Sequence, residues 1–159
     1  LGTRNRDLAN SSGDTSLINS TEGVLYLELA ALTTTNNFES ISVSDGTNDN
    51  RIRIFLDSSA NSPRAQVTTG GVSQGVISAT VSDVTTFNKL AIRYKTNDLA
   101  YFVNGVKVGT DTSATIPSGL NALNLSAGAT NGNPYQGKVK TVAVFKEALT
   151  DAQLISLTS

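Results

Sequence analysis

The 159-residue sequence contains no cysteine, no histidine, no methionine and no tryptophan. Without cysteine there can be no disulfide bonds and no thiolate metal site. Without histidine, the commonest general base and the commonest transition-metal ligand are both missing. Because methionine is absent even from the first position, we expect a processed chain or an excised piece of a longer protein.

Charge is also scarce. Charged residues make up 16% of the chain, and the formal net charge is −1. Such a balance gives no long-range field that would attract nucleic acid. Arg51 and Arg53 share one face of a predicted strand, as do Lys138 and Lys140, but neither pair alternates with aromatic residues that could stack on bases. We therefore interpret both pairs as solvated strand faces and expect no nucleic-acid partner.

Long apolar runs are missing as well. No stretch reaches the roughly 18 apolar residues that suggest a membrane-spanning helix, and no signal peptide is visible, so we expect no membrane insertion. What the chain has instead is 18 Ser, 20 Thr and 15 Asn, together a third of its residues. These residues favour turns and polar strand faces over helices, so the composition predicts a single β-rich domain.

The stretch 89–109 shows this organisation most clearly. It reads KLAIRYKTNDLAYFVNGVKVG, in which large apolar residues alternate with polar or small ones. A period of two places one face of a strand on a core and the other outside. Asn104-Gly105 is a strong hairpin signal, because a type I′ turn needs positive φ at both central residues. The stretch therefore predicts a three-strand antiparallel meander.

Similar alternating runs continue along most of the chain. About ten to twelve short strands are expected in all, including those at 24–32, 40–44, 51–57, 64–69, 72–81, 121–127 and 138–146. The run 138–146 carries apolar residues on both faces, so we expect it to be a central strand covered on both sides. Many short strands separated by turns predict a sandwich of two sheets.

The end of the chain predicts a short helix. Thr150 followed by Gln153 is a capping box, and Leu149 can pack on Leu154 as a hydrophobic staple. The helix is expected to dock through Leu154 and Leu157. Residues 1–22 lack a sustained period and are expected to form an arm or linker remnant, with the folded domain at 23–159.

The meander, followed by LNLSAG and GKVKTVAVFKEALTDAQLISL, resembles the second half of a laminin G-like domain. That domain belongs to the concanavalin A-like lectin/glucanase jelly rolls. The first half, with EGVLYLELAAL and SISVSDGTNDNRIRIFLD, is similar to jelly-roll modules of bacteriophage tail fibres and other virion appendages. The resemblance covers roughly residues 20–158. It implies an all-β, antiparallel two-sheet jelly-roll β-sandwich of the concanavalin A-like type with a short C-terminal helix.

The same resemblance implies a function. It points to a non-catalytic carbohydrate- or host-receptor-binding module on a phage tail fibre or virion appendage, with an extracellular or virion-surface location. Its partners would be a glycan or host-surface receptor, and a homotrimer or other virion proteins. Two alternatives stay open: a structural or decoration domain that mediates virion assembly without glycan binding, and a degenerate or unrecognised glycosidase.

Catalysis is not expected from the residues themselves. Glucanases of this superfamily carry Glu-x-Asp-x-x-Glu on one strand, which supplies a nucleophile and a general acid. The chain has only four glutamates, and none stands in that pattern: Glu22, Glu28, Glu39 and Glu147. A serine nucleophile would lack its histidine.

The loop 128–137 is the first candidate ligand-binding segment. It is long and polar, and long structured loops are often functional. Asn131 and Asn133 offer amides that can bind sugar hydroxyls in a bidentate manner, and Tyr135 offers a stacking face. The alternative is a turn built on Asn-Gly and Asn-Pro, with Tyr135 packed onto the sandwich.

The loop 45–50 is the second candidate. Asp45, Asn48 and Asn50 could bind a ligand, and Asp45 and Asp49 are weak candidates for calcium, although the spacing is not that of an EF-hand. The alternative is a solvated hairpin loop, since turns require these residue types. No cofactor is expected beyond this possible calcium ion. Phe38 is the other loop aromatic, and we interpret it as a core residue.

Overall fold

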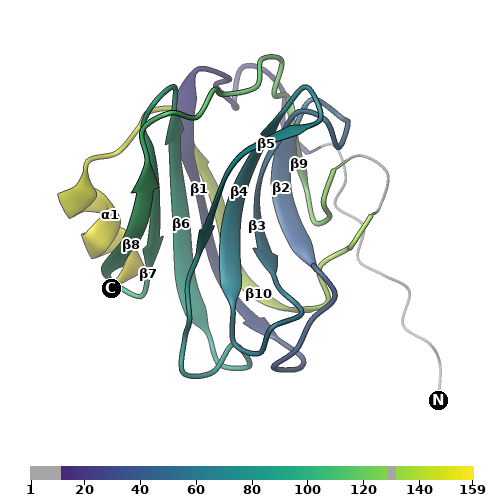
Figure 1. Ribbon diagram of the computed structural model, residues 1–159, viewed down its shortest axis with the longest axis vertical. Helices are drawn as coiled ribbons and strands as arrows, with labels where there is room; N and C mark the ends of the chain where they lie inside the picture. The colour runs from purple at the N-terminus through teal and green to yellow at the C-terminus, as the bar shows by residue number, and fades with distance from the viewer. Residues whose placement is uncertain (1–11, 129–131) are drawn as a thin grey trace.

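A computed structural model describes residues 12–128 and 132–159, and its strands form two antiparallel sheets stacked face to face (Figure 1). Sheet I has the order β10-β1-β6-β7-β8 and sheet II the order β5-β4-β3-β2-β9. This architecture confirms the predicted jelly-roll sandwich with a short C-terminal helix. The strands of sheet I are β10 (Gly137–Phe145), β1 (Glu22–Ala31), β6 (Asn88–Lys95), β7 (Leu99–Val103) and β8 (Val106–Asp111). Those of sheet II are β5 (Val72–Ser78), β4 (Pro63–Thr69), β3 (Arg51–Leu56), β2 (Ser40–Ser44) and β9 (Ala122–Asn124).

The main core lies between the sheets and follows from the alternation of side chains. On β3, for example, Ile52, Ile54 and Leu56 point into the core and are at most 2% exposed. The residues between them must then point to the outer face of sheet II, because successive side chains of a strand face opposite sides. This rule places Arg51, Arg53 and Phe55 together on that outer face.

The predicted meander is confirmed as β6, β7 and β8, which pair in antiparallel register. Asn104 and Gly105 have φ values of 47° and 79°, as a type I′ turn requires. The side chain of Asn104 also ties the turn to its neighbour, since its Oδ1 accepts a hydrogen bond from Lys89 N at 2.9 Å.

The last strand is an edge strand, so the prediction of a central position for 138–146 was wrong. Within 12–128 and 132–159, β10 pairs with β1 alone, and Val139 on its first half is 39% exposed. Apolar residues occur on both of its faces for a different reason. Val142 and Val144 pack on the main core, whereas Phe145 packs on a second cluster outside sheet I.

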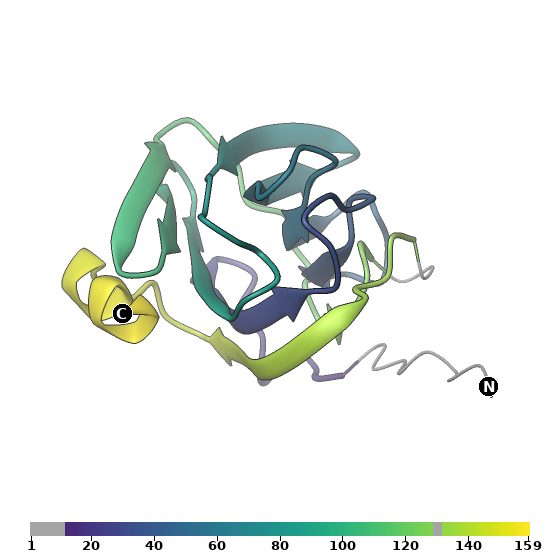
Figure 2. The same cartoon turned by 90° about the horizontal axis from the view of Figure 1, so that it is seen from below.

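That second cluster is covered by the C-terminal helix. Figure 2 looks along the strands and shows α1 (Asp151–Thr158) outside the sandwich. Its N-terminus carries the predicted capping box between Thr150 and Gln153. Leu154 is completely buried against the outer face of sheet I, and Leu157 packs there as well.

The residues before β1 lie against the sandwich where the structure describes them. Ser12 bridges Leu123 of β9, Ile18 is 3% exposed within the core, and the hydroxyl of Tyr94 donates to the carbonyl of Asn19 at 2.9 Å. The division into an arm at 1–22 and a domain at 23–159 stays a prediction. Within 12–128 and 132–159, no helix has the length and apolar character needed to cross a bilayer.

Candidate binding face on sheet II

The loop 45–50 joins β2 to β3 and is held together by its own polar groups. The two carboxylate oxygens of Asp45 accept hydrogen bonds from the backbone and hydroxyl of Thr47, at 2.9 and 2.6 Å, and from the amide of Asn50, at 2.9 Å. Burial alone would raise the pKa of Asp45, but these hydrogen bonds outweigh it and lower the pKa. The side chain of Asp45 therefore stabilises the turn.

The start of the loop 128–137 lies beside the loop 45–50. A Cβ on Gly128 would come within 2.8 Å of the Thr47 carbonyl oxygen, so the two backbones touch there. Arg51 joins the two loops, because its Nη1 donates to Asn48 Oδ1 at 3.0 Å and to the Ala127 carbonyl at 2.8 Å. Asn131, a predicted ligand residue, lies outside the described residues.

The end of the loop 128–137 lies at the opposite end of β2. Pro134 bridges Ser40, and the exposed Asn133 accepts a hydrogen bond from Ser40 N at 2.9 Å through its carbonyl. Tyr135 packs against the main core, its hydroxyl donates to the Ala30 carbonyl at 2.9 Å, and burial raises its pKa. Much of this ring is therefore turned toward the sandwich, and its role in ligand binding stays a prediction.

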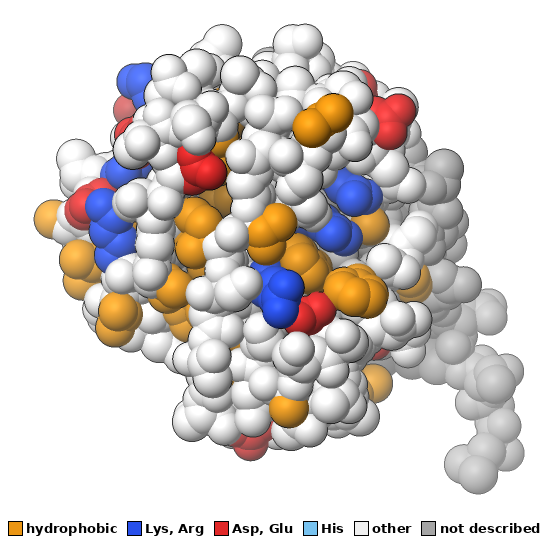
Figure 3. Space-filling view, in the orientation of Figure 1, with side chains coloured by type: hydrophobic (Ala, Val, Ile, Leu, Met, Phe, Trp, Pro, Cys, Tyr) orange, Lys and Arg blue, Asp and Glu red, His pale blue; other side chains and the backbone are white. Residues whose placement is uncertain are grey.

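Between these two ends, the outer face of sheet II presents three cross-strand rows of side chains. β3 supplies the middle of each row, with β2 on one side and β4 on the other. By register, the rows are Ser44–Arg51–Thr68, Ser42–Arg53–Gln66 and Ser40–Phe55–Arg64. Figure 3 views this face from outside and shows basic and hydrophobic side chains side by side at its centre.

Arg53 is the central residue of this face. It is only 9% exposed, so the prediction of a solvated face was wrong for this residue. Its Nε donates to Gln66 Oε1 at 2.7 Å, and its guanidinium carbon lies 4.1 Å from the centre of the Phe55 ring. Burial, together with the nearby charge of Arg51, lowers the pKa of Arg53 to about 10.

The neighbouring positions hold buried polar atoms with no partner. On this face, Arg51 Nε, Arg64 Nε and Thr68 Oγ1 are covered but make no hydrogen bond. The other such atoms among the described residues are Glu39 Oε2, Arg93 Nε and Tyr101 Oη. Buried polar groups normally have a partner, so such exceptions call for an explanation. Arg64 at the end of the third row is ion-paired with Asp57.

Phe38 borders this face and is not the core residue that we predicted. It is 37% exposed and has a φ of 58°, an unfavourable conformation for a bulky side chain. Its ring centroid lies 6.1 Å from that of Phe55, with the planes tilted by 37°. A strained, partly exposed aromatic next to a polar sheet face is a typical feature of a binding surface.

The described residues hold no group of three or more acidic, histidine or cysteine side chains that could bind a metal ion. A calcium ion at the loop 45–50 would therefore have Asp45 and Asp49 as its charged ligands, and Asp45 is already engaged in the turn. Calcium binding there stays a prediction.

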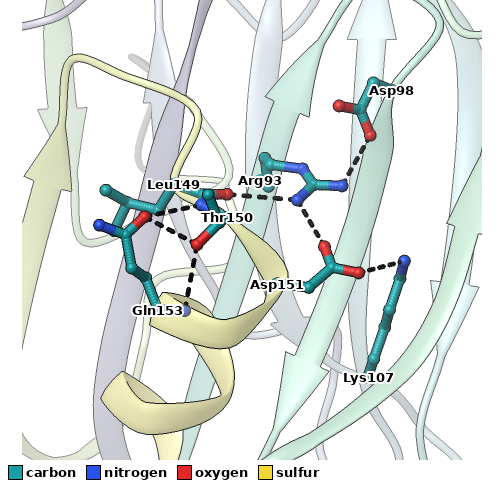
Figure 4. Close-up of polar contacts among 7 residues, drawn as sticks. All are labelled: Arg93, Asp98, Lys107, Leu149, Thr150, Asp151 and Gln153. Atoms are coloured by element: carbon teal, nitrogen blue, oxygen red, sulfur yellow. Dashed lines mark hydrogen bonds and ion pairs between the residues drawn. The ribbon is translucent and has the colours of Figure 1, made fainter.

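The outer face of sheet I has a different character (Figure 4). Arg93 on β6 donates to Asp98 at 2.8 Å, to Asp151 at 2.6 Å and to the Leu149 carbonyl at 3.2 Å. Lys107 donates to the other oxygen of Asp151 at 2.8 Å. This network fixes the start of α1 on the sheet. Each of the four charged residues drawn in Figure 4 is ion-paired with at least one of the others.

Sequence reasoning missed the functional potential of Arg51, Arg53, Phe55 and Gln66. Alternation on β3 predicts a shared face for Arg51, Arg53 and Phe55, and we recognised it for the two arginines, whereas the position of Gln66 depends on how β4 pairs with β3. Their burial could not be predicted from the sequence, because it depends on segments from distant parts of the chain. Ala127, for example, accepts a hydrogen bond from Arg51 although it lies 76 residues away.

Comparison with known proteins supports the fold. No curated protein matches the sequence. The CBM40 domain of the Ruminococcus gnavus IT-sialidase, solved with α2,3-sialyllactose, is similar with a TM-score of 0.72 and 15% identity, over 89% of this chain and 84% of that chain. Domain 4 of a GH43 extracellular arabinanase from Geobacillus stearothermophilus, solved with arabinotriose, is similar with a TM-score of 0.66 and 14% identity, over 90% of this chain and 69% of that chain.

The heptameric SAP-like pentraxin of Limulus polyphemus is similar with a TM-score of 0.67 and 15% identity, over 99% of this chain and 79% of that chain. At such low identities these likenesses concern the fold alone. The family itself is shown by sequence, since the model of the concanavalin A-like lectin/glucanases superfamily matches residues 26–155. The chain therefore belongs to the concanavalin A-like lectin/glucanases superfamily.

Proposed function

We propose that the chain is a non-catalytic carbohydrate-binding module and that it binds glycans on the outer face of sheet II. The observation that carries this proposal is the exposed ring of Phe38, supported by the buried ring of Phe55, beside the polar row of Arg53 and Gln66. Sugars present C–H edges to aromatic rings and hydroxyls to planar polar groups, and this face offers both. Similar folds solved with sialyllactose and arabinotriose support the same class of ligand.

The carboxylates of the described residues support a non-catalytic role. Hydrolysis of a glycosidic bond generally uses two carboxyl groups that flank the scissile bond. The three rows on sheet II contain no carboxylate. Two acidic residues adjoin the rows: Glu39 is half-buried, with a pKa raised by burial, and Asp57 is ion-paired with Arg64, so these two do not form a free pair of carboxyl groups. Glu22 and Glu28 lie on sheet I, where they are ion-paired with Lys95 and Lys140 at 3.0 and 2.8 Å.

The proposal extends to the setting of the module. We place it on a phage tail fibre or another virion appendage, outside the cell, where it would bind a host-surface glycan or receptor and assemble as a trimer or with other virion proteins. This setting is supported by the sequence resemblance. The loop residues Asn131, Asn133, Tyr135, Asp45, Asn48 and Asn50 would contribute to the rim of the face, since the loops that carry them border β2 at its two ends.

A glycan array with purified protein tests the proposal. Wild type is compared with Phe38→Ala on the face, Tyr135→Ala on the loop and Phe87→Ala as a control. Phe87 is a suitable control because it is 49% exposed and carries no part of the face. We expect binding that is weakened by Phe38→Ala and unchanged by Phe87→Ala.

The array is repeated with calcium and with a chelator. A blank array under both conditions would overturn glycan binding and favour a structural domain. Turnover of any oligosaccharide would overturn the non-catalytic role. A loss of binding on chelation would show that binding requires a divalent cation, and the substitution Asp45→Asn would then test whether the loop 45–50 holds it.

A further inference from the structure

Arg51 and Arg53 form a pair of buried or half-buried cations that make no ion pair with a carboxylate in the described chain. Asp49 lies near enough to Arg51 to raise its pKa against the effect of burial, whereas no carboxylate acts on Arg53 in this way. In the part of the chain that the structure describes, neither guanidinium is ion-paired with a carboxylate, whereas Arg64 and Arg93 both are. The pair occupies alternate positions on β3, so their Cα atoms are roughly 7 Å apart on one face. Two cations this close repel each other, which is consistent with the lowered pKa of Arg53.

We infer that the glycan bound at this face is anionic, and that Arg51 and Arg53 bind a carboxylate or sulfate group on one of its sugars. The inference rests on the glycan binding proposed above and names the class of sugar. A guanidinium presents its N–H donors in a planar fork that matches such anions, and charged hydrogen bonds are stronger than neutral ones.

Arg53 is held ready for this role. Gln66 accepts from its Nε at 2.7 Å, and the amide of Gln66 is fixed in turn by donating to Ser73 Oγ at 2.9 Å. The ring of Phe55 supports the guanidinium 4.1 Å from its centroid. Its Nη1 makes one long hydrogen bond, of 3.4 Å, to Ser40, and its Nη2 makes none to the described residues. The donors at the outer end of the fork are therefore free to bind an anion.

Arg51 is oriented in a similar way by the two loops. Its Nη1 is occupied by Asn48 and Ala127, whereas its Nη2 makes no hydrogen bond within the described chain. The orphaned Nε of Arg51 and hydroxyl of Thr68 lie in the same cross-strand row. An anion between the two arginines would give both cations a hydrogen-bonded counter-charge, which Arg53 lacks and which Arg51 has only from the more distant Asp49.

A purely structural role for Arg53 would make a different prediction. The aliphatic stem of Arg53 could cover Phe55 whatever its end group. In that case the charge and the fork would be dispensable, and lysine or glutamine would serve as well. The variants Arg53→Gln, Arg53→Lys and Arg51→Gln therefore separate recognition from packing, provided that their melting temperatures are recorded beside their affinities.

The experiment is a calorimetric titration with matched sugars. The anionic probes are 3′-sialyllactose, tri-galacturonate and 3′-sulfolactose, and the neutral ones are lactose and methyl-esterified tri-galacturonate. We expect at least one anionic probe to bind about tenfold or more tightly than its neutral counterpart. Arg53→Gln and Arg51→Gln should each remove most of that preference, and Arg53→Lys part of it. Lys138→Gln, which removes one exposed charge from β10, should leave it unchanged.

The arms distinguish the possible outcomes. Binding of 3′-sulfolactose alone would identify sulfate as the anion. Binding of 3′-sialyllactose or tri-galacturonate, without binding of 3′-sulfolactose, would identify carboxylate. Equal affinity for neutral and anionic probes would overturn the inference and leave glycan binding intact. A preference that survives both glutamine variants would overturn the assignment to these arginines. If neither these probes nor any glycan of the array binds, the proposed function itself fails.

Discussion

Arg93 and Arg53 are two arginines in matched positions with opposite surroundings. Each lies on the middle strand of its five-stranded sheet, points to the outer face and is 9% exposed. For both, burial by itself lowers the pKa. At Arg93, hydrogen bonds from its guanidinium to Asp151 and Asp98 outweigh this effect and raise the pKa, whereas at Arg53 nothing does so and the pKa falls to about 10.

The difference separates a structural arginine from one available for binding. Around Arg93 the outer face of sheet I is closed, because α1 packs on it and Asp98 and Asp151 neutralise the arginine. The outer face of sheet II keeps its charge, next to the exposed ring of Phe38. Burial of a charge without a partner is unfavourable, so its presence in a fold indicates a role other than stability.

Leu154→Ala should produce the largest effect, because it opens the closed face. Leu154 is completely buried under α1, and truncation of such a residue costs about 2–5 kcal/mol. In urea unfolding, this loss should appear as a lower midpoint concentration of urea. Ile155→Ala is the control on the same helix, since Ile155 is 40% exposed and should change stability by about 0.5 kcal/mol or less. Glycan affinity of the folded Leu154→Ala protein should be that of wild type; a parallel loss would mean that the two faces are coupled.

The same substitution on both faces tests the comparison directly. Arg93→Met leaves Asp98, Asp151 and the Leu149 carbonyl without their donor, and we expect a loss of about 1–2 kcal/mol, because the two carboxylates remain partly solvated. Arg53→Met leaves no carboxylate unpaired and keeps a stem over Phe55, so stability should change by about 0.5 kcal/mol or less. Chemical denaturation of both variants measures the difference. Equal losses would show that Arg53 is structural too.

The elements of this fold were predictable because their signals are local. Alternation over a few residues located the meander, Asn104-Gly105 fixed its turn, and Thr150 with Gln153 located the helix. The edge position of β10 was not predictable in this way. Its two apolar faces imply cover on both sides, but the sequence does not say that α1, rather than a further sheet, covers Phe145 on the outer side.

The candidate site was less predictable than the fold. The sequence placed Arg51 and Arg53 on one face, but their burial depends on contacts with Ala127 and Gln66, which are 76 and 13 residues away in the sequence. In the same way, the exposure of Phe38 depends on its positive φ, which no local pattern requires. Long-range packing decides which polar residues of a β-strand are solvated and which are enclosed.

Gln66→Glu would make the open face resemble the closed one. The glutamate would give Arg53 a carboxylate at the position where Gln66 Oε1 now accepts its Nε hydrogen bond. We expect stability to rise by up to about 1 kcal/mol and affinity for anionic sugars to fall about tenfold, because the arginine is then neutralised within the protein. Gln74→Glu adds the same charge on β5 and is the control. Calorimetry measures the sugar affinity of the two variants, and denaturation measures their stability. An unchanged affinity of Gln66→Glu for anionic sugars would contradict the anionic site.

Acid should weaken the Arg93–Asp151 contact on the closed face, with the smallest effect of the series. Hydrogen bonds from Lys107 and Arg93 lower the pKa of Asp151 below its ordinary value of 3.8, so its contribution to stability is present above that value and is lost as the pH falls through its pKa in the folded protein. Because Asp151 is 44% exposed, we expect less than about 1 kcal/mol. Wild type and Asp151→Asn should therefore differ in free energy of unfolding near neutral pH and converge in acid. A difference in free energy of unfolding that stays the same at every pH would show that Asp151 acts through packing. Wild type and Arg53→Gln should keep a constant gap over the same range, because Arg53 has no carboxylate partner among the described residues whose protonation could change it.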